Sequence, residues 1–282
     1  MSLTARAFAK INLFLDITGK REDGYHELDS VFQSVSLFDE ITLILNNEGV
    51  SVICDNDELS GEDNIVFRAC KMFFEETGYS GGVNIEIKKN IPVAAGLAGG
   101  SADAAATLFL LNKALNSNLS PEKLCELGKK LGADVPFCLT GGTARVKGIG
   151  EKISPLNTPT LHYVLLKDRE KQSTGKMFAI VDERDQKHHN GIDSLIRGIK
   201  KSDISLIGGH LFNSFEICWD FDEMTKPFID FYPKGVFLSG SGPTVCALFE
   251  NANDAINCAD SLKKQGLNAF YACSVGSGLE LV

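Results

Sequence analysis

A run of small residues in the first half of the chain could bind phosphate. Residues 91–106 read I-P-V-A-A-G-L-A-G-G-S-A-D-A-A-A, and no side chain between Ala94 and Ala102 is larger than that of Leu97. Glycine lets a backbone approach a ligand closely and adopt positive φ. Where such a loop opens a helix, the unpaired N–H groups and the positive end of the helix dipole favour an anion. The run therefore predicts a phosphate-binding loop, and the alternative is a turn that only lets a helix pack closely on a strand.

This loop differs from two common phosphate motifs. A P-loop ends on Gly-Lys-Ser/Thr, whereas here Gly100 is followed directly by Ser101. The dinucleotide pattern G-x-G-x-x-G cannot be placed on Gly96, Gly99 and Gly100. The sequence thus predicts phosphate binding outside both classes.

Lys10, Asn12 and Asp134 are candidates for acid–base chemistry. Lys10 and Asn12 lie two residues apart in an alternating stretch, so their side chains share one face of a predicted strand. Asp134 stands in a short Gly-Ala-Asp-Val-Pro turn. A carboxylate beside an ammonium group stays charged, and such a pair can accept and steer a hydroxyl proton. The alternatives are a solvated Lys and an Asp that hydrogen-bonds its own turn, so the pair requires a fold that brings Lys10 to Asp134.

Two consecutive rings, Tyr25 and His26, follow Gly24 in a polar loop. Rings of this kind stack on planar bases. The alternative is an ordinary pair of surface rings.

Hydrophobic periodicity predicts the elements that must position these residues. Residues 7–18 and 83–88 alternate apolar and polar side chains, which is typical of strands. Residues 101–116 carry an apolar helical stripe, and Ser120 precedes a proline that suits a first helical position. Mixed strands and helices without strict β-α alternation favour the α+β class. The other predicted segments are strands at 28–37, 41–45, 143–147, 161–166, 245–249 and 269–274, helices at 63–78 and 254–264, a glycine turn at 238–244 and a polar loop at 182–190.

Length and composition indicate a globular protein with two modest domains. The chain has 282 residues, of which 44% are hydrophobic and 23% are charged. Residues 151–160 hold two prolines and little periodicity, so we predict domains at 1–155 and 156–282. No apolar run is long enough for a membrane span, and the net charge of -9 gives no support to a nucleic-acid partner.

The cysteines indicate a reducing compartment. All eight are scattered singly, without a C-x-x-C pair or a Cys/His cluster, which argues against a zinc or redox site. The first ten residues contain no apolar signal core. We therefore predict a cytoplasmic protein with reduced cysteines.

Four motifs resemble those of one enzyme family. Residues 7–28, A-F-A-K-I-N-L-F-L-D-I-T-G-K-R-E-D-G-Y-H-E-L, resemble the N-terminal signature of the 4-diphosphocytidyl-2-C-methyl-D-erythritol kinases, which belong to the GHMP superfamily of small-molecule kinases. Residues 92–105 look like the ATP loop of that superfamily. Residues 132–137, G-A-D-V-P-F, and 238–249, L-S-G-S-G-P-T-V-C-A-L-F, are similar to its other two motifs. The K-R-x-D-G-Y-H run is the most specific of these features.

The resemblance implies a fold and a reaction. The fold would be the α+β, two-domain GHMP kinase fold, with an N-terminal ribosomal-protein-S5-domain-2-like domain and a C-terminal ferredoxin-like domain. The reaction would be phosphorylation of the 2-hydroxyl of 4-diphosphocytidyl-2-C-methyl-D-erythritol by ATP with Mg²⁺, giving the 2-phosphate and ADP in the non-mevalonate isoprenoid pathway. The alternatives are a related kinase acting on homoserine, mevalonate or a sugar, which would not need the rings of Tyr25 and His26, and a nucleotide-binding module without turnover, which would not need Lys10 and Asp134.

The resemblance also assigns roles by motif position. Asp134 would take the hydroxyl proton, and Lys10 would assist it. His26 would stack on the cytosine and read it, with Phe178 or its neighbour Met177 as the second wall. ATP would be bound by Pro92, Val93, Ala94, Ala95, Gly96, Leu97, Ala98, Gly99, Gly100, Ser101 and Ala102. The substrate would be bound by Asn12, Tyr25, His26, Phe178, Gly240 and Gly242.

A magnesium ligand can be proposed from the same loop. The hydroxyl of Ser101 is the candidate on the metal side, and Asp103 is its competitor. Asp103 also suits the first turn of a helix, where a carboxylate is favoured by the dipole. We therefore prefer the helix-dipole interpretation for Asp103. The sequence leaves the direct metal ligands open, with Ser101 as the candidate through Mg-ATP.

Overall fold

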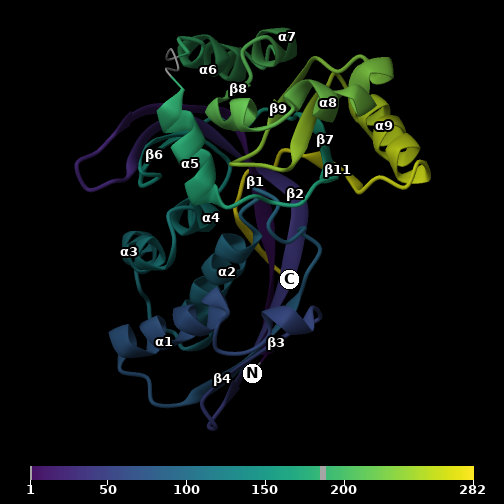
Figure 1. The fold of residues 1–282 in the computed structure, drawn as a ribbon. Helices are drawn as coiled ribbons and strands as arrows, with labels where there is room; N and C mark the ends of the chain where they lie inside the picture. Colours follow the sequence, from purple (N-terminus) through teal and green to yellow (C-terminus); the bar gives the residue numbers. More distant parts are fainter. Residues whose placement is uncertain (1, 185–188) are drawn as a thin grey trace.

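The computed structural model describes residues 2–184 and 189–282 (Figure 1). The predicted polar loop at 182–190 therefore lies partly outside the described residues. Within the described ranges the chain forms two sheets with helices packed on them. The predicted α+β class is confirmed.

β1 (Ser2–Lys20) and β2 (His26–Asn46) form a long antiparallel pair through the centre of the molecule (Figure 1). The prediction of two separate strands at 28–37 and 41–45 was wrong, because β2 covers both. Asp39 lies between those stretches, and its buried carboxylate accepts hydrogen bonds from the backbone N–H groups of Asn90 and Ile91. These bonds compensate the burial of the charge, so the strand continues through it.

The first sheet has eight strands, in the order β12-β1-β2-β4-β3, with β5 on β2, β6 on β5 and β8 on β1. β1 is buried from residue 7 to residue 17, instead of on one face only, because residues of the second sheet pack on it as well. The remaining strands of this sheet are β3 (Val50–Cys54), β4 (Gly82–Lys88), β5 (Thr143–Gly148), β6 (Lys152–Leu156), β8 (Phe212–Asn213) and β12 (Leu279–Leu281).

Helices α1 to α4 lie together beside the first sheet (Figure 1). α1 (Ile65–Thr77) and α3 (Pro121–Leu131) begin at the side-chain caps of Asn64 and Ser120. α2 (Gly99–Ala114) contacts β1, β2 and the other three helices, so it is buried on nearly all sides and not only along the predicted stripe. Its alanines make this close packing possible. The short α4 (Val135–Thr140) follows α3 directly.

The second sheet is antiparallel and has the order β11-β7-β10-β9. Along the chain its strands follow one another as β7, β9, β10 and β11. Helices lie between β7 and β9 and between β10 and β11, whereas β9 leads to β10 without a helix. This β-α-β-β-α-β arrangement is the ferredoxin-like pattern that was expected. The strands are β7 (His162–Leu166), β9 (Gly235–Leu238), β10 (Val245–Phe249) and β11 (Ala269–Cys273).

Helices complete the second half of the chain. α9 (Ala252–Lys264) packs on β7, β10 and β11. α6 and α7 lie together at the end of the molecule opposite the N-terminus (Figure 1). The helices between β7 and β9 are α5 (Thr174–Glu183), α6 (Ile192–Lys201), α7 (Ile204–Gly208) and α8 (Phe221–Thr225), with short 3-10 turns at Ser214–Cys218 and Lys226–Phe231.

The two halves of the chain are interlocked. The second sheet begins at His162, after the predicted boundary, but β8 and β12 pair with β1 in the first sheet. An apolar cluster fills the space where the two sheets meet. In the part of the chain that the structure describes, no helix has the length and apolarity needed to span a membrane. All eight cysteines are free thiols.

Candidate active site

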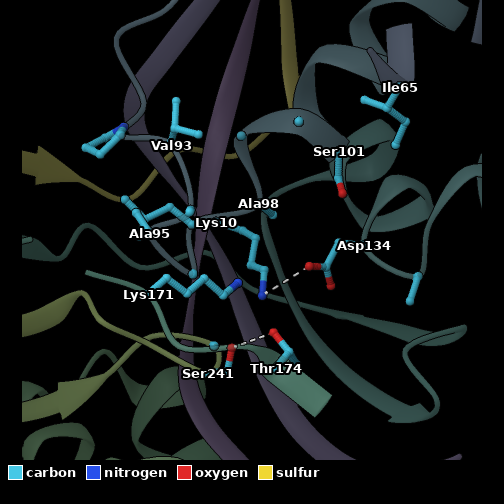
Figure 2. A pocket seen from close by; sticks show the side chains of 18 of the residues that line it. Lys10, Ile65, Val93, Ala95, Ala98, Ser101, Asp134, Lys171, Thr174 and Ser241 are labelled. Atoms are coloured by element: carbon cyan, nitrogen blue, oxygen red, sulfur yellow. Dashed lines mark hydrogen bonds and ion pairs between the residues drawn. The ribbon is translucent and has the colours of Figure 1, made fainter. Parts of the chain in front are cut away.

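A cavity of about 680 Å³ lies where the two halves meet (Figure 2). Residues 91–98, which we call the phosphate loop, form one wall, and the start of α2 continues it. Residues 239–242, the second glycine turn, contribute Gly240 and Ser241. Ten of the predicted ATP residues line the cavity, from Pro92 to Ser101, whereas Ala102 does not, because it is buried inside α2.

The phosphate loop is held in one conformation by its own buried residues. Ala95 and Leu97 are 3% and 1% exposed. The carbonyl of Leu97 accepts a hydrogen bond of 3.1 Å from the backbone N–H of Lys10, which joins the loop to β1. Ala94 and Ala98 have φ of 53° and 58°, the left-handed region that costs an alanine about 1–2 kcal/mol. The loop geometry is therefore imposed by its surroundings rather than by local preference.

The second glycine turn supports the phosphate loop from the other side. Ser239 Oγ donates a hydrogen bond of 3.1 Å to the carbonyl of Gly96. A Cβ on Gly96 would lie 2.3 Å from the carbonyl oxygen of Ser239, and Gly96 has a φ of 78°. Both facts require glycine there. The two glycine segments therefore pack backbone against backbone.

The start of α2 offers unpaired donors to the cavity. Its first intrahelical hydrogen bond runs from the N–H of Ala102 to the carbonyl of Ala98, at 2.9 Å. The N–H groups of Gly99, Gly100 and Ser101 precede that bond and have no acceptor within the helix. Three donors and the positive end of a helix thus face the cavity, a setting that favours phosphate.

The structure brings Lys10 and Asp134 together. Lys10 Nζ lies 3.5 Å from Asp134 Oδ2, and Figure 2 shows the two side chains pointing toward one another. The Lys10 side chain is 5% exposed and that of Asp134 is 31% exposed. Asp134 stands at the N-cap position of α4, but its side chain makes no capping hydrogen bond. Its carboxylate is therefore free to face the cavity instead of stabilising its own turn.

Asn12 orients the ammonium group of Lys10. Asn12 Oδ1 accepts hydrogen bonds from Lys10 Nζ at 3.0 Å and from the backbone N–H of Gly240 at 2.9 Å. Its amide nitrogen donates to Ser30 Oγ at 3.3 Å. Asn12 is fully buried at the floor of the cavity, which it lines, and it couples Lys10 to the second glycine turn. Gly242, the last residue of that turn, does not line the cavity, and a Cβ there would come within 2.8 Å of the Trp219 indole nitrogen.

His26 and Phe178 are brought together as expected, but they stack directly on each other. Their ring centroids are 4.3 Å apart with an interplanar angle of 15°. A base between them would need roughly twice one stacking distance, so the rings must separate to admit it. Phe178 lines the cavity, whereas Met177 is fully buried, which favours Phe178 as the wall. Tyr25 is 60% exposed and does not line the cavity.

Sequence reasoning missed Asp182, which holds His26 in place. Asp182 Oδ1 lies 2.7 Å from His26 Nε2, and Asp182 Oδ2 lies 2.6 Å from Lys20 Nζ. The hydrogen bond from Lys20 and, secondarily, that from His26 lower the pKa of Asp182. Asp182 is some 150 residues from the loop of His26 in sequence, so no local pattern links them.

A buried ionic cluster behind the phosphate loop was also missed. Lys89 Nζ bonds to Asp39 Oδ2 and lies 2.7 Å from Asp103 Oδ2, while Asp103 Oδ1 has no partner. Burial raises the pKa of Asp103 to about 8, against the opposing effect of Lys89. Asp39 also binds the N–H groups of Asn90 and Ile91, so the cluster ties both ends of the loop together. Asp103 is thus held by Lys89 in a buried structural contact.

Lys171 completes the set of missed residues. It lies between β7 and α5 and lines the cavity near Lys10 and Asp134 (Figure 2). Burial lowers its pKa, Lys10 lowers it further, and Asp134 acts in the opposite direction.

Comparisons with known proteins agree with this arrangement. The family model for the GHMP kinases N terminal domain matches residues 64–142, and the model for GHMP kinases C terminal matches residues 229–268. The 4-diphosphocytidyl-2-C-methyl-D-erythritol kinase of Thermoanaerobacter sp. (strain X514) is 37% identical over 99% of this chain and 98% of its own length. The kinase of the same name from Clostridium beijerinckii is 40% identical over 96% of this chain and 99% of its own length.

Solved structures give the same result. A crystal structure of 4-(cytidine 5'-diphospho)-2C-methyl-D-erythritol kinase matches with a TM-score of 0.85 and 29% identity, covering 97% of this chain and 100% of the other. A homoserine kinase from Cytophaga hutchinsonii matches with a TM-score of 0.78 at 20% identity, which shows the fold alone. The chain is an ATP-dependent small-molecule kinase, and it belongs to the 4-diphosphocytidyl-2-C-methyl-D-erythritol kinase family of the GHMP kinases.

Proposed function

We propose that this chain transfers the γ-phosphoryl group of ATP to the 2-hydroxyl of 4-diphosphocytidyl-2-C-methyl-D-erythritol, giving the 2-phosphate and ADP in the non-mevalonate isoprenoid pathway. The observation that carries the proposal is the 3.5 Å contact between Lys10 and Asp134 at a cavity walled by the phosphate loop. Phosphoryl transfer needs positioning and charge stabilisation more than covalent chemistry. A donor-lined loop, a cation and a base in one cavity meet that need.

Asp134 acts as the base in this proposal. Its exposed carboxylate oxygens accept the proton of the substrate hydroxyl as that oxygen attacks phosphorus. Lys10 stabilises the carboxylate and the oxygen that is losing its proton, because its ammonium group is fixed by Asn12 and faces Asp134. The ring of Phe32, 4.4 Å from Lys10 Nζ, limits the access of water to the cation.

The phosphate loop binds the triphosphate. The N–H groups of Gly99, Gly100 and Ser101 donate to phosphate oxygens, and the small side chains from Ala94 to Ala98 let those oxygens approach the backbone. The buried cluster around Lys89 holds both ends of the loop before ATP arrives. The donors are therefore oriented in advance and need little reorganisation during the reaction.

The residues present fit a magnesium ion that is held mainly through phosphate oxygens. Among residues 2–184 and 189–282, no group of three or more His, Cys, Asp or Glu side chains could hold a metal. Magnesium commonly keeps several waters and binds one or two protein oxygens besides the phosphates. Ser101 would supply such an oxygen from the first turn of α2. The ion, when bound, would neutralise charge on the β- and γ-phosphates.

The cytidine end of the substrate would lie at His26 and Phe178. Separating these stacked rings exposes two parallel faces for the cytosine, and Asp182 keeps the imidazole of His26 oriented. Tyr25 would close over the ligand from the exposed loop. Homoserine, mevalonate and sugars have no ring for this clamp, so it would select against them.

The cellular compartment and the roles of the two halves of the chain are part of the same proposal. Free cysteines and an ATP-dependent reaction on a small molecule suit the cytoplasm, with no nucleic-acid partner. Residues 1–155 would bind ATP and carry the catalytic pair, and residues 156–282 would supply Phe178 and the second glycine turn.

One assay tests the proposal. ADP release is measured with 4-diphosphocytidyl-2-C-methyl-D-erythritol, and separately with homoserine and with mevalonate. We expect turnover with the cytidine diphosphate compound alone. Turnover with either of the other acceptors at a comparable kcat/KM would refute the proposed substrate.

A further inference from the structure

Lys171 is a cation in the cavity that the proposed mechanism does not use. It belongs to the segment that links β7 to α5 in the second half of the chain, and it lines the same cavity as Lys10 and Asp134. Figure 2 shows its ammonium group directed at the Lys10–Asp134 pair. The Lys10–Asp134 pair therefore has a third charged group beside it, from the second half of the chain.

The ammonium of Lys171 has no anion of its own. Within the described residues it makes no hydrogen bond and no ion pair, whereas nearby Lys167 lies 3.7 Å from Glu170. Lys10 and Lys171 share one carboxylate, Asp134. Burial first, and repulsion from Lys10 second, lower the pKa of Lys171, while Asp134 opposes this shift. Two cations opposite one carboxylate leave a positive excess that an anionic ligand would balance.

The segment that carries Lys171 is anchored to the nucleotide side of the cavity. Thr174 Oγ1 and Ser241 Oγ are hydrogen-bonded at 3.1 Å, which fixes the start of α5 to the second glycine turn (Figure 2). That turn in turn supports Gly96 of the phosphate loop. Lys171 is thus held at a defined place relative to the phosphate-binding donors.

We propose that Lys171 is a further catalytic residue, whose ammonium group binds the γ-phosphoryl oxygens of ATP and stabilises them during transfer. The inference rests on the proposed function. In the proposed reaction, the group between Asp134 and the phosphate loop is the γ-phosphoryl group that is being transferred. Its charge is spread over three oxygens. Lys10 comes from β1 and Lys171 from the segment before α5, and Figure 2 shows their two ammonium groups side by side, so that both cations face the same part of the cavity.

The chemical step balances without any change at Lys171. A bond forms between the acceptor oxygen and the γ-phosphorus, and the bond from that phosphorus to the bridging oxygen breaks, leaving its electron pair on ADP. The hydroxyl proton goes to Asp134. Lys171 remains an ammonium group throughout and acts by charge and hydrogen bonding alone.

Nucleotide affinity tests the contact without any acceptor. Calorimetry compares ADP with the non-hydrolysable β,γ-imido analogue of ATP, both with Mg²⁺, on the wild type, Lys171→Met, Lys171→Arg and the matched control Lys176→Met. Lys176 is exposed on α5 and lies outside the cavity. We expect Lys171→Met to lower the affinity for the analogue about tenfold more than the affinity for ADP, a difference of about 1.4 kcal/mol in binding free energy. Lys171→Arg should restore most of the loss, and Lys176→Met should show none.

If Lys171→Met lowered the affinities for ADP and for the analogue equally, or changed neither affinity, the proposal would be overturned. Kinetics supply the second readout: Lys171→Met should lower kcat about 100-fold, the scale of one lost transition-state donor, with the acceptor KM within about threefold. A raised acceptor KM at unchanged kcat would place Lys171 on the other substrate and also overturn it. Should Lys171→Met not fold, Lys171→Gln is judged by the same criteria. If the wild type fails to phosphorylate the cytidine substrate, the proposed function fails, while the calorimetric ratio still decides the contact.

Discussion

Replacing Asp134 by Asn tests the catalytic pair most directly. The change keeps the shape of the side chain and removes its charge and its capacity to take a proton. At 3.5 Å and an effective dielectric constant of 20, the attraction between Lys10 and Asp134 is about 5 kcal/mol. Because the Asp134 side chain is 31% exposed, solvent screening reduces this to about 2 kcal/mol. Loss of a general base lowers the rate by a further factor of about 100 to 10,000, which corresponds to a barrier raised by about 2.7–5.4 kcal/mol.

We therefore expect Asp134→Asn to lower kcat by about 100- to 10,000-fold while ADP binds with unchanged affinity. The donors for the nucleotide phosphates belong to the phosphate loop and α2, and neither depends on Asp134. ADP release measures the first quantity, and calorimetry with ADP measures the second. A change in kcat of less than about tenfold would exclude Asp134 as the base.

A double-mutant cycle with Lys10→Met separates a working pair from two independent residues. Met keeps the length and apolar stem of Lys10 under the ring of Phe32. If the two residues act as one unit, the double variant should lose about as much kcat as the more damaging single variant. Multiplicative losses would contradict the shared role, even if each residue mattered separately.

Three further outcomes are expected. Phe178→Ala should raise the acceptor KM about 5- to 150-fold, from the loss of about 1–3 kcal/mol of stacking, with the ATP KM within twofold; similar effects on both would refute the clamp. Gly96→Ala should lower the free energy of unfolding by about 2–5 kcal/mol in urea titrations, since it adds left-handed strain to a clash with Ser239. The raised pKa of Asp103 means that folding takes up a proton, so the free energy of unfolding should fall as pH rises above the ordinary carboxyl pKa near 4 toward the raised pKa of the folded state. Asp103→Asn should flatten that dependence in urea titrations at several pH values.

The elements that could be predicted from sequence are those whose cause is local. The alternation at 83–88, the Ser120 cap and the glycine-rich entry to α2 each depend on neighbours within a few residues. The shared face of Lys10 and Asn12 is local as well, and their hydrogen bond follows from it. Such features are fixed by backbone geometry before any tertiary contact forms.

The features that could not be predicted depend on residues far apart in sequence. The predicted strands left out residues 38–40, because the partners of Asp39, the N–H groups of Asn90 and Ile91, lie some fifty residues away. Lys89 looked like an ordinary strand end, although its ammonium group bridges two buried carboxylates. The meeting of Lys10 with Asp134 was implied only by a resemblance, since no spacing rule joins a strand to a turn beyond α2 and α3.

The contacts between the two glycine segments make the site a joint product of both halves of the chain. Asn12 shares one oxygen between Lys10 and the N–H of Gly240, so the ammonium group of Lys10 is oriented by a residue that the second half of the chain also binds. Gly96 in turn accepts from Ser239. Residues 1–155 alone would leave Asn12 without its Gly240 partner and the phosphate loop without its support. The boundary predicted at residue 155 falls inside β6, and two later strands pair with β1 in the first sheet, so the site depends on the whole chain.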